Sequence, residues 1–124
     1  MSWFSSRAHI PAVSAVAAHV LVEHEHAMLL DVGAPHEWAL GHLPGAHLLH
    51  YDGAFDYELI RTTASTSVVI LGCRNQQRGA EFVSDLRAHA IDAMLLDRGP
   101  WAWEHAGFGL VGATNGAQFI QTPS

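Results

Sequence analysis

Residues 68–80 read Val-Val-Ile-Leu-Gly-Cys-Arg-Asn-Gln-Gln-Arg-Gly-Ala, and this stretch decides the fold prediction. The segment from residue 67 to residue 71 is the most β-branched of the chain, which predicts a central strand. Residues 78–90 carry apolar side chains at helical spacing, which predicts a helix. The only cysteine, Cys73, therefore lies in a polar turn between the end of a buried strand and the start of a helix.

The rest of the chain repeats this alternation of strands and helices. Further strands are predicted over residues 27–32, 46–50 and 92–97. Further helices are predicted over residues 14–22 and 36–40, within residues 52–62, and from Pro100 onward. Ser14 is the predicted N-cap of the first helix. The side chains predicted on the inner side of that helix are Val13, Val16, Val20 and Leu21. Strands that alternate with helices pair in parallel through crossover connections, so we expect an α/β sheet with helices on both faces.

Length and composition bound the class of protein. The 124 residues suit one domain, residues 1–124, and 49% hydrophobic against 15% charged residues argues against a disordered chain. Residues 111–124 lack helical or strand periodicity, so we predict a C-terminal tail after a core of about residues 10–110.

Several classes of function are excluded by residue counts. All 6 basic residues are arginine, and the lack of lysine excludes Schiff-base chemistry and a lysine-based phosphate loop. The net charge of −6 argues against a nucleic-acid partner, and a single cysteine excludes an intramolecular disulfide and a cysteine-rich zinc site. The N-terminus lacks a signal-peptide pattern, and the longest apolar stretch, residues 12–22, is too short to cross a bilayer. We therefore expect a cytoplasmic protein without a membrane partner.

The turn after the predicted central strand has the features of a reactive cysteine. In open α/β sheets, ligands bind beyond the carboxyl ends of the strands. The N-terminus of the next helix presents unpaired N–H groups and partial positive charge, and Arg74 and Arg78 flank the turn. We expect these groups to lower the pKa of the Cys73 thiol and to hold an anion. The alternative is a small, buried and unreactive cysteine at a strand end.

Three groups of residues, in order along the chain, resemble the signatures of rhodanese-like domains. They are Leu30-Asp31-Val32, Glu37-Trp38 and Gly41-His42-Leu43-Pro44-Gly45-Ala46 near the start, the loop from Cys73 to Arg78, and Gly99 with Trp103-Glu104-His105-Ala106-Gly107 near the end. The Gly-His-Leu-Pro-Gly-Ala segment is the most specific, and the matches extend over roughly residues 10–110. The resemblance implies a rhodanese-like fold, which is a parallel five-stranded sheet flanked by helices on both faces.

The resemblance also implies sulfur transfer through Cys73. Its thiolate would take the outer sulfur of thiosulfate or of a similar small anion, hold it as a persulfide, and pass it to cyanide or to a thiol, including a protein thiol. The backbone amides of residues 74–78 would surround the persulfide, and two arginines would hold the donor's sulfonate. The implied substrate-binding residues are Arg74, Asn75, Gln76, Gln77 and Arg78. The implied chemistry requires no metal and no organic cofactor.

The length of the loop separates two activities of this fold. Rhodanese-fold phosphatases carry Cys-x5-Arg, and the extra residue widens the loop for a tetrahedral phosphate. Here Cys73 and Arg78 form the shorter Cys-x4-Arg, which suits a terminal sulfur. The loop length therefore favours sulfur transfer over phosphatase or arsenate reductase activity.

Three residues depart from the family pattern. Gln76 stands where the family usually has glycine, and in a left-handed backbone it would cost on the order of 1 kcal/mol. Gly79 replaces a small hydroxyl residue and would remove a hydrogen bond at the helix end. Gly33 replaces an arginine and would remove an ion pair with a neighbouring carboxylate. These departures favour, as the alternative function, a non-catalytic interaction module or a redox-sensing module on the same fold.

Polar residues outside the loop are predicted to be structural. Asp31 and His42 lie in the leading signature, and we expect them to tie the strand end to the following loop. On an extended segment His24 and His26 would face the same side, a spacing that can bind a metal. Their acidic neighbours favour a solvated loop instead, and no metal site is predicted.

Overall fold

The computed structural model describes residues 10–112 and 118–119. Over these residues the elements follow in the order β1 (Ala12–Val13), α1 (Ala15–Glu25), β2 (Met28–Gly33), α2 (Pro35–Leu40), β3 (His47–His50), α3 (Tyr57–Ala64), β4 (Val69–Cys73), α4 (Gln76–Ala88), β5 (Ala93–Leu96), α5 (Gly99–His105) and β6 (Gln118–Phe119). Strands and helices alternate, as the sequence predicts.

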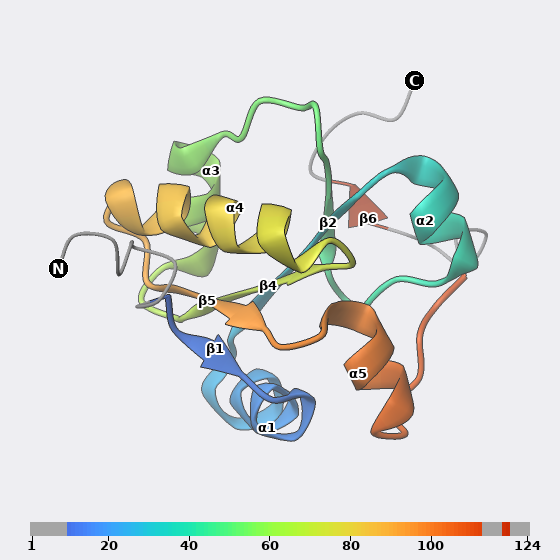
Figure 1. The fold of residues 1–124 in the computed structure, drawn as a ribbon. Helices are drawn as coiled ribbons and strands as arrows, with labels where there is room; N and C mark the ends of the chain where they lie inside the picture. The colour runs from blue at the N-terminus through green and yellow to red at the C-terminus, as the bar shows by residue number, and fades with distance from the viewer. Residues whose placement is uncertain (1–9, 113–117, 120–124) are drawn as a thin grey trace, which may run out of the picture.

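The strands form one parallel sheet in the order β1-β5-β4-β2-β3-β6 (Figure 1). The strands β1 to β5 make up the five-stranded sheet that the resemblance implies, so the predicted fold class is confirmed. The strands β2 and β4 lie in the middle, with Leu30 opposite Leu71 and Val32 opposite Cys73. Every residue of both strands is buried, as expected for parallel strands covered on both faces.

Two short strands lie where the sequence predicts other structure. Val13, predicted on the inner side of the first helix, belongs to β1 and pairs with β5. The tail 111–124, predicted without a strand, contributes β6, which pairs in parallel with β3. Strands of two residues show no periodicity, and they are defined by hydrogen bonds to partners far away in sequence. Residues 113–117 and 120–124 of the tail lie outside the described residues.

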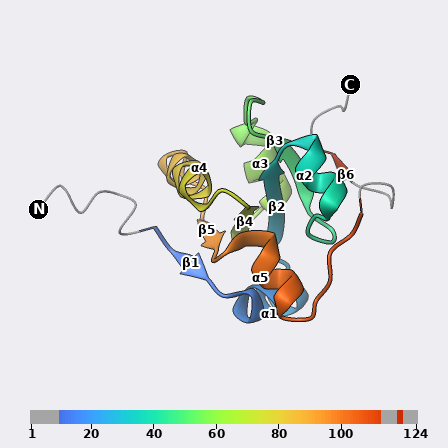
Figure 2. The same ribbon diagram turned by 45° about the vertical axis from the view of Figure 1, so that its right-hand side comes forward.

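Helices cover both faces of the sheet, as predicted. One apolar cluster lies between the sheet and helices α3 and α4, and a second between the sheet and α1 and α5. Figures 1 and 2 show these two helix pairs on opposite sides. Leu30, Leu71 and Cys73 belong to the first cluster, whereas Leu29 and Ile70 belong to the second. The alternation of side chains along the strands therefore directs Cys73 toward α4.

The first helix begins where predicted, but only part of its predicted inner side is buried: Val13 and Leu21 pack against the second cluster. Ser14 caps α1 by accepting a backbone N–H of the first turn at 3.1 Å. Val16 and Val20, predicted on the inner side, are 60% and 49% exposed, while Ala15 and Ala18 are buried. Apolar residues surround most of this helix, so the hydrophobic pattern alone does not determine which side packs against the sheet.

Candidate active site

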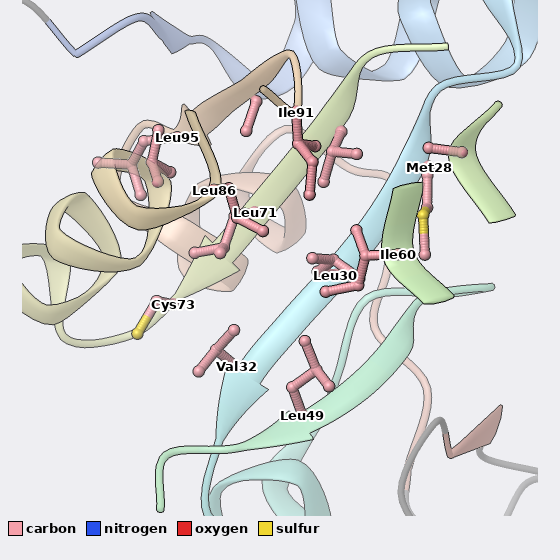
Figure 3. Close-up of a cluster of buried hydrophobic side chains, with 14 of the residues drawn as sticks. Met28, Leu30, Val32, Leu49, Ile60, Leu71, Cys73, Leu86, Ile91 and Leu95 are labelled. Atoms are coloured by element: carbon pink, nitrogen blue, oxygen red, sulfur yellow. The ribbon is translucent and has the colours of Figure 1, made fainter. Parts of the chain in front are cut away.

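Cys73 is the last residue of β4, at the carboxyl end of a central strand. Its side chain has no exposed surface and lies at the edge of the apolar cluster that includes Leu71 and Val32 (Figure 3). The Asn75 backbone N–H donates a hydrogen bond to the sulfur, and the sulfur lies 4.0 Å from the Tyr51 hydroxyl oxygen. The thiol thus lies at the carboxyl end of the sheet, as predicted, between the start of α4 and Tyr51, which follows β3.

The turn after Cys73 is shorter than predicted, because α4 begins at Gln76 rather than at Arg78. Asn75 is the N-cap: its side-chain Oδ1 accepts the Arg78 N–H at 3.0 Å, and its carbonyl accepts the Gly79 N–H at 2.9 Å. The Arg78 amide is therefore engaged in the cap. The prediction that the amides of residues 74–78 all converge on the sulfur is wrong for Arg78, while the Asn75 amide does reach it.

Gln76 joins the turn to the β5–α5 connection. Its Nε2 donates to the Cys73 carbonyl at 2.8 Å and to the Leu96 carbonyl at 3.4 Å, and its Oε1 accepts the Arg98 N–H at 2.9 Å. Gln76 is helical and is not among the residues with positive φ, so the strain predicted for it is absent. Its side chain, predicted to bind substrate, is occupied by backbone groups.

Two glycines allow helices to approach Cys73 closely. A Cβ on Gly79 would lie 3.0 Å from the Cys73 Cβ and 2.9 Å from Leu95 Cδ1. Gly99 has a φ of +64°, and a Cβ there would lie 2.6 Å from the Cys73 carbonyl oxygen. From the sequence, glycine at position 79 is predicted only to remove a hydrogen bond. In the structure it allows α4 to pack directly on the cysteine.

The two arginines of the turn are exposed and point to neighbours other than the sulfur. Arg74 donates to the Gly41 carbonyl at 3.0 Å. The Arg78 guanidinium carbon lies 5.1 Å from the centre of the Tyr51 ring and 5.5 Å from that of Phe82. Both arginines lie beside the site as predicted, and Arg78 stacks on the ring whose hydroxyl faces the thiol.

Asp31 connects β2 to the loop of residues 41–46, and His42 connects this loop to α2. Asp31 is 4% exposed, and its Oδ2 accepts the Leu43 N–H at 2.9 Å. The buried His42 places its Nδ1 3.4 Å from the Trp38 carbonyl oxygen. Burial raises the pKa of Asp31 from 3.8 to about 6, against the lowering effect of the Leu43 N–H. The Asp31 contact ties the strand to the following loop, whereas the His42 contact ties that loop to α2, and the structural role of both residues stays a prediction.

The pKa of the Cys73 thiol is raised, which contradicts the predicted lowering. Burial is the main cause, and the carboxylates of Glu37 and Asp31 raise it further. The Asn75 N–H and the Tyr51 hydroxyl lower it, with a smaller effect than burial. The prediction was wrong because it counted the arginines near the turn without their direction, and because the carboxylates come from distant parts of the sequence.

Sequence reasoning missed Tyr51 and Glu37 as members of the site. Tyr51 follows β3, and its hydroxyl donates to Glu37 Oε2 at 3.5 Å. Glu37 lies on α2, and in the sequence it stands out only as a residue of the leading signature. The position of Tyr51 in the sequence could have identified it, because it follows a strand whose carboxyl end lies on the same side of the sheet as Cys73.

Neither a metal cluster nor a membrane-spanning helix is found in the described part of the chain. Within residues 10–112 and 118–119, no group of three or more His, Cys, Asp or Glu side chains could hold a metal ion. The extended segment considered for His24 and His26 is wrong, because α1 continues through Glu25 and His26 is its left-handed C-cap. None of the helices in these residues has the length and apolarity needed to cross a membrane.

Fold and site together define an open parallel α/β protein with a candidate nucleophile between a central strand and a helix N-terminus. The chain belongs to the family of rhodanese-like domains, whose family model matches residues 14–106. No curated protein matches the chain significantly.

Solved structures show the same fold at low sequence identity. A thiosulfate sulfurtransferase from Pseudomonas aeruginosa is 20% identical with a TM-score of 0.71, over 96% of this chain and 23% of that one. A rhodanese-like domain protein from Staphylococcus aureus is 24% identical with a TM-score of 0.62, over 83% and 98% of the two chains. A Rhodopseudomonas palustris protein, described as a possible tyrosine phosphatase, is 15% identical with a TM-score of 0.69, over 84% and 86%.

Proposed function

We propose that this protein is a sulfurtransferase that carries sulfur on Cys73, taking it from thiosulfate or a similar donor and passing it to cyanide or a thiol. The observation that carries the proposal is the position of the Cys73 sulfur. It lies at the end of central strand β4 and accepts the Asn75 N–H at the start of the 13-residue helix α4. Arg74 and Arg78 lie on either side of that turn, where an anionic donor would need them.

The reaction would proceed in two covalent steps. The Cys73 thiolate attacks the outer sulfur of thiosulfate, so that a new S–S bond forms, the S–S bond of the donor breaks and sulfite leaves with the bonding electrons. Cyanide or a thiolate then attacks the terminal sulfur of the persulfide and releases the Cys73 thiolate. The Asn75 amide and the partial positive charge of the helix N-terminus would stabilise the negative sulfur in both steps.

Loading requires a movement at the surface of the site, because the sulfur is fully buried at rest. Arg78 rests on the Tyr51 and Phe82 rings, and such cation–π contacts contribute about 0.5–1 kcal/mol at exposed sites. A hydrogen bond to a charged group contributes about 1.5–3 kcal/mol. The stronger interaction with an anionic donor would therefore draw Arg78 away from the rings and open access to the sulfur.

The test is thiosulfate:cyanide turnover by the wild type and by Cys73→Ser. We expect the wild type to gain the mass of one sulfur atom after incubation with thiosulfate and to release it to cyanide. The serine variant should show neither effect. Turnover that survives in Cys73→Ser would falsify this mechanism.

The buried thiol with its raised pKa favours a second candidate function, a non-catalytic interaction module or redox sensor. It predicts no persulfide with any common sulfane donor, together with a protein partner that binds the domain. Both of these functions are favoured over a phosphatase or arsenate reductase, because the loop is Cys-x4-Arg. Hydrolysis of p-nitrophenyl phosphate that depends on Cys73 would instead favour phosphatase activity.

A further inference from the structure

Two hydrogen bonds link the Cys73 thiol to a carboxylate through a phenol. The thiol donates to the Tyr51 hydroxyl oxygen across 4.0 Å, and that hydroxyl donates to Glu37 Oε2 across 3.5 Å. The three groups come from β4, from the residue after β3, and from α2. The direction of both hydrogen bonds leads from sulfur toward the carboxylate.

The backbone holds both partners of the thiol in place. The Tyr51 N–H donates to the Gly33 carbonyl at 3.1 Å, and the Ala34 N–H donates to Glu37 Oε1 at 2.9 Å. A Cβ at Gly33 would lie 3.0 Å from Glu37 Oε1, closer than ordinary van der Waals contact. Glycine at position 33 thus leaves the space into which the Glu37 carboxylate folds.

We propose that Tyr51 and Glu37 form a proton relay that deprotonates Cys73 for the sulfur transfer proposed above. The S–H bond breaks as the proton moves to the Tyr51 oxygen, and the phenolic proton of Tyr51 moves to Glu37 Oε2. The products are a thiolate, a phenol and a neutral carboxylic acid, so the total charge stays the same. Tyr51 contacts the reacting sulfur directly, whereas Glu37 acts through Tyr51.

Burial explains why such a relay is needed. The Cys73 side chain has no exposed surface, so water cannot take its proton directly. If the proton left the protein while Glu37 stayed ionised, two negative charges would lie close together in a poorly solvated site. The relay moves one charge from carboxylate to sulfur instead of adding a second. When the persulfide is discharged, Glu37 returns the proton by the reverse path.

The other charged or titratable groups around the relay have partners of their own. Asp31, on β2, accepts the Leu43 N–H, and Arg74 donates to the Gly41 carbonyl. Arg78, on α4, stacks on the Tyr51 ring. His50, at the end of β3, lies 3.9 Å from the Asp52 carboxylate.

The rate at which iodoacetamide alkylates the protein tests the relay, because Cys73 is the only thiol and sulfur transfer is not required. Rates would be measured from pH 6 to pH 10 for the wild type, Glu37→Gln, Tyr51→Phe and the double variant. The relay predicts that each single variant reduces the rate near pH 7 by about tenfold or more, and that the double variant is no slower than either. Tyr57→Phe is the matched control, since the Tyr57 ring stacks on His89, and its rate should stay within about twofold of the wild type.

A purely electrostatic role of Glu37 gives the opposite result. Removing a negative charge near the thiol would favour the thiolate, so Glu37→Gln would react faster than the wild type at pH 7. Faster alkylation of Glu37→Gln overturns the relay. If that variant does not fold, as judged by circular dichroism, Tyr51→Phe decides, and a wild-type rate and pH profile overturns the relay. Failure of the sulfurtransferase proposal is seen separately, as a wild type that gains no sulfur from thiosulfate.

Discussion

The Cys73 thiol has basic residues on one side and acidic residues on the other, and the two sets of residues make different contacts. On the basic side, residues 74–78, one guanidinium is bound to a carbonyl and the other lies over aromatic rings. On the acidic side, Asp31, Glu37 and Tyr51 lie deeper, and both carboxylates raise the pKa of the thiol. Arginines close in sequence thus affect the sulfur less than carboxylates that folding brings together.

Burial explains this difference. Asp31 is 4% exposed, so its charge acts in a medium that screens it weakly, whereas the arginines are exposed and screened by solvent. The number of charges near a cysteine therefore does not predict its reactivity. The reactivity of the thiol depends on the depth and direction of each charge, and single substitutions can change one side at a time.

The largest effect is expected where α5 begins against the basic side. Gly99→Ala would place a Cβ 2.6 Å from the Cys73 carbonyl oxygen at a φ of +64°. We expect a loss of about 2–5 kcal/mol in the free energy of unfolding, from backbone strain and from displacement of the turn. Urea unfolding measures it. Gly45→Ala is the control, because Gly45 has a φ of +74° with no atom within 4 Å of its Cβ position, so it should lose only about 1 kcal/mol. Equal losses would contradict the contact.

The next effect concerns the acidic side and depends on pH. The folded-state pKa of Asp31 is about 6, against its ordinary value of 3.8, so the native protein binds more protons between these pH values. Stability therefore falls as pH rises through this window, by on the order of 3 kcal/mol for this group. Asp31→Asn removes the charge and keeps an oxygen for the Leu43 N–H. Its stability relative to wild type should rise by on the order of 3 kcal/mol between pH 4 and pH 7, measured by urea unfolding.

The control for Asp31→Asn is Asp97→Asn, which changes an exposed carboxylate. If both variants show the same dependence on pH, the buried position of Asp31 does not cause the effect. Asp31→Asn should also lower the pKa of the Cys73 thiol, because the Asp31 charge is one of the causes that raise it. Alkylation rates at several pH values measure that shift.

The sequence predicts the sheet and the place of the thiol well, because both depend on local patterns. The β-branched segment of residues 67–71 and the apolar run before Gly33 identify the two central strands. The start of α4 is missed by two residues, although Asn75 is a preferred N-cap residue and would have marked it. Local chemistry thus determines the elements and most of their ends.

The surroundings of the thiol could not be predicted in the same way. Tyr51 lies 22 residues before Cys73, and no local pattern connects them. Gln76 suggests strain when compared with the family pattern, yet its amide group binds three backbone groups on two segments. Such contacts follow from tertiary packing, which also decides where Arg74 and Arg78 point.

A smaller effect is expected from Gln76→Ala on the basic side. The variant removes the side-chain hydrogen bonds to Cys73, Leu96 and Arg98, and we expect it to lose about 1–3 kcal/mol of unfolding free energy. Gln77→Ala changes the exposed neighbour on the same helix turn and should lose less than about 0.5 kcal/mol. Thermal or urea unfolding of the two variants measures the difference. If the two variants are equally stable, the Gln76 contacts do not hold the turn in place.

The smallest effect on stability is expected from Arg78→Ala, although its effect on binding should be clear. The cation–π contacts with Tyr51 and Phe82 are exposed, so their loss should cost less than about 1 kcal/mol of unfolding free energy. The same variant should raise the KM for thiosulfate by about tenfold, because a charged hydrogen bond to the donor is lost. Arg61→Ala, which removes an exposed arginine of α3 that pairs with Glu58, should leave KM unchanged.

A KM for Arg78→Ala equal to that of Arg61→Ala would change the comparison of the two sides. The donor would then be bound by Arg74 and by the N-terminus of α4, and Arg78 would serve only to cover the Tyr51 ring. A raised KM with unchanged stability would instead show that the basic side acts on the substrate while the acidic side acts on the thiol. The two sides would then control separate steps, the binding of the donor and the removal of the thiol proton.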